Sequence, residues 1–203
     1  MKDAAAFYAT IRHGKMLGPT LTQDEVNGLA AILTAMSGAP VAYAAYALAT
    51  AYHETAHTMQ PIEERGGAAY FHRMYDCRGN RPQVARELGN ICPGDGARYH
   101  GRGYVQLTGR RNYARAQDEL GQNLVAQPDL ALDPAIAASV MRRGMDEGWF
   151  TGAKLATWLP PAGVSTPAQF VKARRIINGT DCADLIADYA VQFQGALVAG
   201  GWA

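Results

Sequence analysis

The sequence is short of charge, of cysteine and of long apolar runs, and each shortage excludes a class of protein. Charged residues make up 18% of the 203 positions and the net charge is +1, which does not favour nucleic-acid binding. The three cysteines are an odd number and form no disulfide framework. The most apolar run, residues 41–52, is shorter than the roughly 20 residues of a membrane helix. We therefore expect neither a nucleic-acid partner nor stable membrane association.

The near-balance of charge leaves room for a polyanionic substrate, because a local groove can be basic on a neutral protein. The first 17 residues contain Asp3 and no apolar segment followed by a cleavage site, so we expect no signal peptide. The cysteines are expected to be reduced and structural, although Cys77 and Cys92 could pair under oxidising conditions. At this length, with 48% hydrophobic residues, one domain can bury a sizeable core.

Helical periodicity dominates the chain and predicts a mainly α fold. Thr22 and Glu25 form a capping box before a helix that ends near Gly38. A second, alanine-rich helix should start at about residue 41 and end near Met59, because Pro61 cannot continue it. Residues 66–103 look irregular apart from a short helix, and residues 104–108 could be extended. The other helices are expected at about 81–88, 112–120, 134–147, 166–177 and 182–198.

Residues 52–65, YHETAHTMQPIEER, combine three carboxylates with two histidines at the end of the apolar helix. Inverting cleavage of a glycosidic bond needs two carboxyl groups roughly 6.5–9.5 Å apart. On one continuous helix Glu54 and Glu64 would be about 15 Å apart, which is too far. The break at Pro61 lets the chain turn back, so the two groups could face each other across a cleft.

The environments expected for these carboxylates suggest different roles. Burial disfavours the charged form of a carboxyl group, so Glu54 on the ordered helix suits a general acid. Glu64, beside Arg65 in a loop, suits a general base. Glu63 is the alternative base. Adjacent glutamates at a helix end are also commonly just solvated, so the spacing alone does not decide the function.

The same stretch contains the zinc-binding pattern HExxH, formed by His53, Glu54 and His57. Two histidines four residues apart on a helix can bind Zn²⁺ with the glutamate as base. A third ligand is required, and neither His72 nor His100 has a spacing that supplies one. The favoured interpretation is that both histidines are packing residues and that the site holds no metal and needs no cofactor.

Three segments of the sequence resemble glycoside hydrolase family 19, and in particular its compact bacteriophage endolysins. The segments are HETAHTMQPIEE, YHGRGYVQLTGRRNYA and ARRIINGT, and the similarity runs from about residue 21 to 193. The resemblance implies a mainly α, lysozyme-like fold with two lobes and long loops around a substrate cleft. It also implies that residues 1–203 are a single catalytic domain without a separate wall-binding domain.

The resemblance assigns roles to particular residues. It makes Glu54 the general acid and Glu64, with Glu63 adjacent, the general base. It implies that Thr108 and Gln106 hold the attacking water and line the sugar cleft. The substrate-contacting residues that it suggests are Asn112, Asn178 with Arg174 or Arg175 nearby, and Tyr104.

Each of these assignments has a structural alternative. Gln106 and Thr108 could satisfy the backbone of a buried loop, and Asn178 could simply end a helix. Tyr104 could be a core residue instead of a sugar-stacking one. Arg102 could brace a loop against a carboxylate or meet an acidic stem peptide.

The function that the resemblance implies is an endolysin that hydrolyses β-1,4 bonds of peptidoglycan glycan strands with inversion, causing lysis of the host cell. We expect a monomer that stays in the host cytoplasm until a holin pore lets it reach the periplasm and cell wall. The alternatives are a chitinase, a zinc peptidase using residues 53–57, and a non-catalytic wall-binding module.

Overall fold

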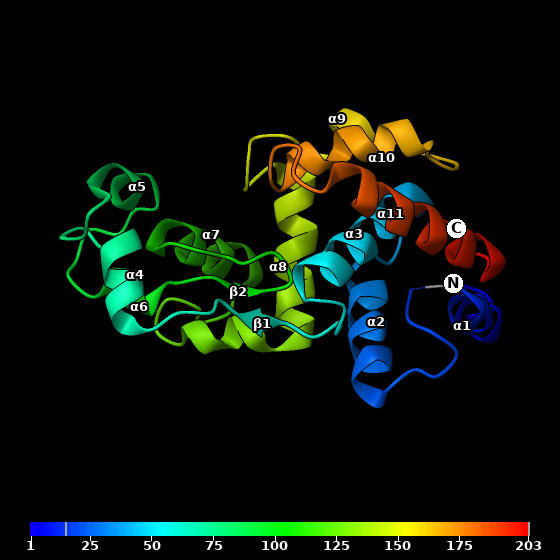
Figure 1. The fold of residues 1–203 in the computed structure, drawn as a ribbon, viewed down its shortest axis with the longest axis horizontal. Coiled ribbons are helices and arrows are strands. Elements are labelled where there is room, and N and C mark those ends of the chain that lie inside the picture. The colour runs from blue at the N-terminus through cyan, green and yellow to red at the C-terminus, as the bar shows by residue number, and fades with distance from the viewer. Residues whose placement is uncertain (15, 203) are drawn as a thin grey trace. The chain divides into compact units, whose positions relative to one another are not determined.

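The computed structural model describes residues 1–14 and 16–202, and the chain divides into two compact units. Unit 1 consists of Met1–Gln60 and Met141–Ala203, and unit 2 of Pro61–Val140. Helices dominate both units, which confirms the predicted mainly α fold (Figure 1). Within the described residues, no helix combines the length and the apolar character needed to cross a bilayer.

Unit 1 is built around helix α3 (Val41–Glu54), whose residues from Ala42 to Tyr52 are all buried. Alanine at most of these positions lets neighbouring helices approach closely, and α3 packs against α11 (Ala183–Ala199) and α2 (Gln23–Ala35). The predicted capping box is present at the start of α2. Thr22 Oγ1 accepts from Glu25 N at 3.2 Å, and Glu25 Oε2 accepts from Thr22 N at 2.7 Å.

The remaining helices of unit 1 surround this core. Helix α1 (Ala4–His13) packs against α11 and begins where Asp3 Oδ1 accepts from Ala6 N at 2.9 Å; the sequence analysis did not predict it. The helix expected after Thr166 is present, but it tightens into a 3-10 turn in its last part. The expected helix corresponds to α10 (Pro167–Ala173) followed by the 3-10 turn η2 (Arg174–Ile176). A separate short helix, α9 (Leu155–Trp158), precedes it in the chain.

Unit 2 contains short helices and one antiparallel ladder. Strand β1 (Ile62–Glu63) pairs with β2 (Arg102–Gly103), with Glu63 opposite Arg102. The helices are α4 (Ala68–Tyr75), α5 (Pro82–Glu87), α6 (Asp95–Arg98), α7 (Arg110–Leu120), η1 (Pro128–Leu132) and the first part of α8 (Pro134–Glu147). The boundary between the units falls inside α8, whose limits match the prediction.

Two local predictions for unit 2 are wrong. Residues 66–103 were expected to be irregular, but they contain α4 and α6, neither of which has a side-chain cap that the sequence could signal. Residues 104–108 were expected to be extended, but most of them form a turn. Gln106 adopts a φ of +53° there, and the turn is closed by the pairing of Arg102 with Leu107.

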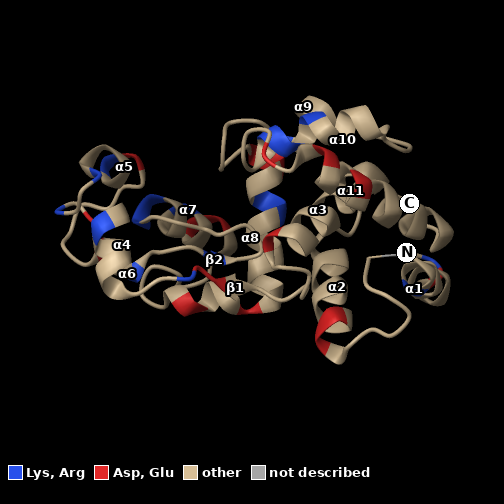
Figure 2. Cartoon of the chain, in the orientation of Figure 1, with Lys and Arg blue, Asp and Glu red and all other residues tan. Residues whose placement is uncertain are grey.

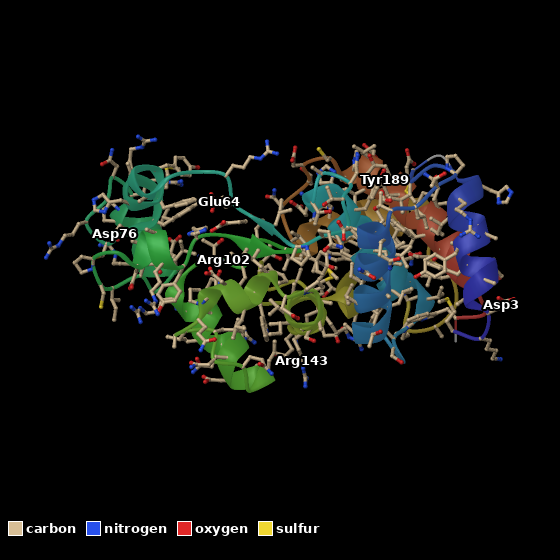
Figure 3. All side chains as sticks on the ribbon, turned by 90° about the horizontal axis from the view of Figure 1, so that it is seen from below. Asp3, Glu64, Asp76, Arg102, Arg143 and Tyr189 are labelled. Carbon is tan, nitrogen blue, oxygen red and sulfur yellow. The ribbon has the colours of Figure 1, made fainter. Side chains whose placement is uncertain are left out.

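The loops of unit 2 are held by a fully buried carboxylate, Asp76, at the end of α4 (Figure 3). It accepts hydrogen bonds from Arg78 N at 3.1 Å, Gly94 N at 2.7 Å and Gly96 N at 3.3 Å. A side chain at Gly96 would collide with the carbonyl oxygen of Phe71, 2.6 Å from the position of its Cβ. Burial alone raises the pKa of Asp76, but these three donors lower it below its ordinary value.

We predict that Asp76→Ala destabilises the protein by about 3 kcal/mol, because three backbone amide groups, one buried and two partly buried, lose their acceptor. Urea unfolding measures this, and Asp118→Ala on exposed α7 is the control, with an expected change within about 0.5 kcal/mol. Since the pKa of Asp76 is lowered by folding, its contribution is complete above the unfolded pKa of about 3.9 and is lost as the pH falls through the folded value. The difference between wild type and variant should therefore shrink below about pH 4. A difference that stays constant from pH 7 to pH 3 contradicts this account.

Candidate active site

The residues predicted to carry the chemistry fall into two groups, one in each unit. Glu54 ends α3 in unit 1, and Asn178 follows η2 in the same unit. The other predicted residues belong to unit 2 and lie on β1, directly after β1, on the loop after β2 and on α7: Glu63, Glu64, Tyr104, Gln106, Thr108 and Asn112.

Helix α3 ends at Glu54, so the predicted end near Met59 is wrong. Ala56 takes a left-handed φ of +50°, and its N–H donates to His53 O at 3.2 Å. The N–H of His57 donates to Tyr52 O at 2.8 Å, which completes a Schellman motif. The early end lets the buried Met59 backbone pack on Gly28 of α2, where any side chain would collide with Met59 O. This tertiary contact overrides the helical propensity of the segment.

The early end of α3 also removes the helical spacing on which the predicted zinc site depended. His57 lies past the end of α3 with a φ of +74°, so His53 and His57 do not share a helix face. The His57 ring instead stacks on Tyr52, with ring centroids 4.3 Å apart. Among the residues that the structure describes, no three His, Cys, Asp or Glu side chains are grouped closely enough to hold a metal ion.

Glu54 is held by a buried arginine of unit 1. Arg174 Nη1 donates to Glu54 Oε1 at 2.7 Å, and Arg174 Nε donates to Asp181 O at 2.8 Å. The Arg174 side chain is 1% exposed, against 23% for the Glu54 side chain. The guanidinium therefore holds the carboxylate of Glu54 on its buried side. Tyr46 and Thr50, both buried, precede Glu54 by two turns and one turn of α3. Burial lowers the pKa of the neighbouring His53.

The other residues predicted in this region have simpler surroundings. Asn178 is exposed and its N–H donates to Arg174 O at 3.0 Å, after which Gly179 takes a φ of +46°. This is the geometry of a helix end, which agrees with the structural alternative. Of the two arginines suggested near the site, Arg174 contacts Glu54, whereas Arg175 lies over the ring of Trp158, 5.8 Å from its centroid.

Glu64 in unit 2 is fixed by three hydrogen bonds. Tyr75 OH donates to Glu64 Oε1 at 2.7 Å, Gly101 N donates to Glu64 Oε2 at 3.0 Å, and Glu64 N donates to Gly101 O at 2.8 Å (Figure 3). Burial, followed by the contact with Glu64, raises the pKa of the Tyr75 hydroxyl. The hydroxyl therefore remains a donor throughout the physiological range.

Three side-chain oxygens converge on Gly101. A Cβ atom on Gly101 would lie 2.8 Å from Gln106 Oε1, 3.1 Å from Glu64 Oε2 and 3.2 Å from Thr108 Oγ1. The amide of Gln106 is oriented by donating to Ile62 O at 3.1 Å and to Gly103 O at 3.2 Å. Thr108 Oγ1 donates to Gln106 O at 2.8 Å, so its lone pairs can accept a hydrogen bond from a water molecule.

Glu63 is held on the opposite side of the strand, because successive side chains of β1 alternate. Its Oε1 atom lies 2.7 Å from His100 Nε2 and 3.8 Å from Arg102 Nη2. The ring of His100 stacks on Phe71 at 4.2 Å. Of the two candidate bases, it is therefore Glu64 that the structure brings together with Gln106 and Thr108.

Tyr104 is not available to a sugar, because its side chain is 0% exposed; that prediction is wrong and the core alternative holds. Asn112 donates through Nδ2 to Thr108 O at 2.7 Å, so it supports the loop that carries Thr108. Arg102 is 5% exposed and forms an ion pair with Asp129 at 3.0 Å. This contact agrees with the structural interpretation of Arg102, in which it holds a loop against a carboxylate.

A family model described as chitinase class I, glycoside hydrolase family 19, matches residues 33–143. That is more than half of the sequence, and it includes Glu54, Glu64 and Thr108. The chain belongs to glycoside hydrolase family 19. The matched range ends before Arg174 and Asn178, so the partner of Glu54 is placed by the structure alone.

Solved structures of chitinases share the fold. Chitinase C from Streptomyces griseus HUT6037 is 24% identical with a TM-score of 0.57, and the alignment covers 98% of this chain and 76% of the other. A bacterial family 19 chitinase is 26% identical with a TM-score of 0.55, covering 97% and 94% of the two chains. Acidic endochitinase Q of Nicotiana tabacum is 53% identical over 38 residues, a stretch that spans 19% of this chain and 15% of that relative.

Two residues that contact Glu64 were not predicted from the sequence. Tyr75 reaches Glu64 from α4, a helix that sequence analysis missed, so nothing in its surroundings pointed to the site. Gly101 lies inside the GRGYVQLTG stretch, and its spacing from Gln106 and Thr108 was visible. Only the structure shows why position 101 is glycine, because three side-chain oxygens surround the place where a Cβ atom would lie.

We predict that Gly101→Ala lowers kcat by roughly 100-fold, because the new methyl group displaces the oxygens of Glu64, Gln106 and Thr108. The fold should survive, since the colliding atoms belong to side chains and not to the backbone, and Gly101 has an ordinary φ. Glycan hydrolysis and circular dichroism measure the two effects. Gly195→Ala on α11, where a Cβ meets nothing within 4 Å, is the matched control and should retain activity. Full activity of Gly101→Ala would show that these oxygens are not catalytic.

Proposed function

We propose that this family 19 chain is an endolysin that hydrolyses β-1,4 bonds in the glycan strands of peptidoglycan by single displacement with inversion. The observation that carries the proposal is the convergence of Glu64, Gln106 and Thr108 above Gly101. It supplies one carboxylate and two neutral oxygens that can accept hydrogen bonds from a water molecule.

In the proposed reaction Glu64 and Thr108 accept the two hydrogens of a water molecule, which leaves an oxygen lone pair free to attack the anomeric carbon. Glu64 takes a proton as the new C–O bond forms. Glu54 gives its proton to the leaving glycosidic oxygen as the old C–O bond breaks. The configuration at the anomeric carbon is inverted, and one proton exchange with solvent restores both carboxyl groups. The proposal requires Glu54 and Glu64 to act on the same bond.

The contacts of the two side chains fix the directions in which each can transfer a proton. Glu64 is fixed by Tyr75 and Gly101 and faces the polar cluster, which suits a base that orients water. Glu54 is anchored at one oxygen by Arg174, so the protein fixes the direction of the carboxyl group. Such positioning makes a large contribution to catalysis.

We predict that Glu54→Gln and Glu64→Gln each lower kcat by at least 100-fold with unchanged circular dichroism, because each removes a proton-transfer group. Glu63→Gln is the matched control. Glu63 contacts His100 and Arg102 instead of the Thr108 cluster, so the loss should be less than about 10-fold, below the usual effect of removing an acid or base. If Glu63→Gln abolishes turnover and Glu64→Gln does not, the roles of the two glutamates are reversed.

Chitin is the second candidate substrate, favoured by the names of the similar proteins, which are chitinases and an endochitinase. Mass spectrometry of the ends released from purified sacculi, beside digestion of chitin oligomers, separates the two substrates and identifies the bond. Stereochemistry is read by NMR of the first anomer formed, and a retained anomer contradicts the inverting mechanism. Parallel assays with EDTA test for any dependence on metal.

We further propose that the protein acts as a monomer, accumulates in the host cytoplasm and reaches the wall through a holin pore. We predict that bacteria producing it alone keep growing and lyse within minutes when the inner membrane is permeabilised, because the substrate lies beyond that membrane. Culture turbidity measures this, with Glu54→Gln as the inactive control. Spontaneous lysis without permeabilisation contradicts the dependence on a pore.

A further inference from the structure

Although the net charge of the whole chain is small, positive charge is concentrated in one segment. Residues 65–111 contain nine arginines and three acidic residues, a net charge of +6 in a chain whose total is +1. The remainder of the chain is therefore at −5. Every basic side chain between residues 61 and 140 is an arginine, and none is a lysine. Arginine differs from lysine in its rigid fork, which pairs with a carboxylate through two hydrogen bonds.

Two of the three acids of this segment are buried and do little to neutralise its surface, whereas Glu87 is exposed. Asp76 is 0% exposed and accepts backbone N–H groups. Asp95 is 2% exposed and pairs with Arg110, whose Nε donates to Asp95 Oδ2 at 2.8 Å. The third acid, Glu87, accepts from Gln83 on the same helix at 2.8 Å.

Seven arginines of this segment are exposed. We call five of them, those from residue 73 to 86 together with the one at the start of α7, the arginine cluster: Arg73, Arg78, Arg81, Arg86 and Arg111. Within the described part of the chain, no acidic side chain lies within 4.0 Å of their guanidinium groups. In unit 1, by contrast, arginines pair with Asp146, Glu147 and Glu54. Figure 2 shows basic residues over α4, α5 and the start of α7.

Asn90, which is 2% exposed, links the backbone segments that carry the arginine cluster. Its Nδ2 donates to Tyr75 O at the end of α4, its N–H donates to Ala85 O of α5, and its Oδ1 accepts from Arg110 N at the start of α7. Further bonds join the arginines themselves, from Asn80 N to Arg73 O at 2.9 Å and from Arg111 Nη2 to Arg86 O at 3.1 Å. The charges are thus held on one framework.

We propose that the arginine cluster binds the carboxylates of peptidoglycan stem peptides and retains the enzyme on the intact wall. This rests on the proposed function, because it takes the glycan strand as the substrate. Repulsion among unpaired guanidinium groups is relieved when an anionic polymer binds, and the arginine fork fits the planar carboxylates of the peptides. Chitin has no such charge, so the arginine cluster distinguishes an anionic wall polymer from a neutral one. It lies in the same unit as Glu64, which couples retention to catalysis.

The test uses a variant in which Arg73, Arg78, Arg81 and Arg86 are all changed to Gln. The matched control removes four exposed positive charges of unit 1, at Lys2, Arg12, Lys154 and Lys172, so both proteins have the same net charge. Binding is measured by pelleting with Gram-negative sacculi, which carry no teichoic acid, at 50 and 300 mM salt. Turnover is measured on the same sacculi before and after an amidase has removed the stem peptides.

We expect the cluster variant to bind intact sacculi at least 10-fold more weakly than the control at 50 mM salt, with a flatter salt dependence. Its turnover on amidase-stripped strands should equal that of wild type. Unchanged binding to intact sacculi overturns the proposal, and so does an equal loss of turnover on intact sacculi and on amidase-stripped strands. Competition by DNA or polyphosphate at concentrations where a glutamate-containing stem peptide has no effect also overturns it, in favour of a phosphate polymer.

The outcome is separable from that of the proposed function. If the wild type releases no reducing ends from either substrate, the hydrolytic assignment fails whatever the binding results. If hydrolysis of stripped strands is normal and the cluster variant is retained on intact sacculi, the hydrolytic assignment stands and the binding proposal fails.

Discussion

The geometry of the site depends on how the chain leaves helix α3. Glu54 is the last helical residue, and the Schellman motif at Ala56 and His57 turns the backbone out of the helix immediately after it. A carboxylate in this position keeps the rigidity of a buried helix while its tip stays partly exposed. One more helical turn would have carried His57 onto the face of His53 and produced a metal-ligand geometry. The close approach of Met59 to Gly28 prevents that turn.

The loops of unit 2 are held in place differently, because its helices are short and its ladder has only two residues in each strand. Buried polar groups take the place of regular structure there. Asp76 and Asn90 each bind backbone atoms from more than one segment, and Arg102 binds the carbonyl oxygens of Arg98 and His100. A loop held by buried hydrogen bonds can be rigid without a large apolar core, because breaking any one of them leaves a polar group unpaired. This rigidity places Gln106 and Thr108 beside Glu64.

Family membership and local chemistry answer different questions about this protein. The match to family 19 fixes the class of enzyme, and the similar structures fix the fold. The proposed preference for an anionic glycan over a neutral one rests on residues outside the group formed by Glu64, Gln106 and Thr108. It rests on the excess of arginine between residues 65 and 111.

The sequence by itself determined the helical class, the capping box at Thr22 and the limits of α8, because these follow from periodicity and caps. The roles of Glu54 and Glu64 stay predictions that rest on the family resemblance. The sequence could not predict the end of α3, since that depends on a contact with Gly28, thirty-one positions from Met59 in the chain. Nor could it separate Glu63 from Glu64, assign Tyr104 to the core or find Tyr75. Those outcomes depend on which face of a strand or loop a side chain occupies, and only the hydrogen bonds and packing of the folded chain decide that.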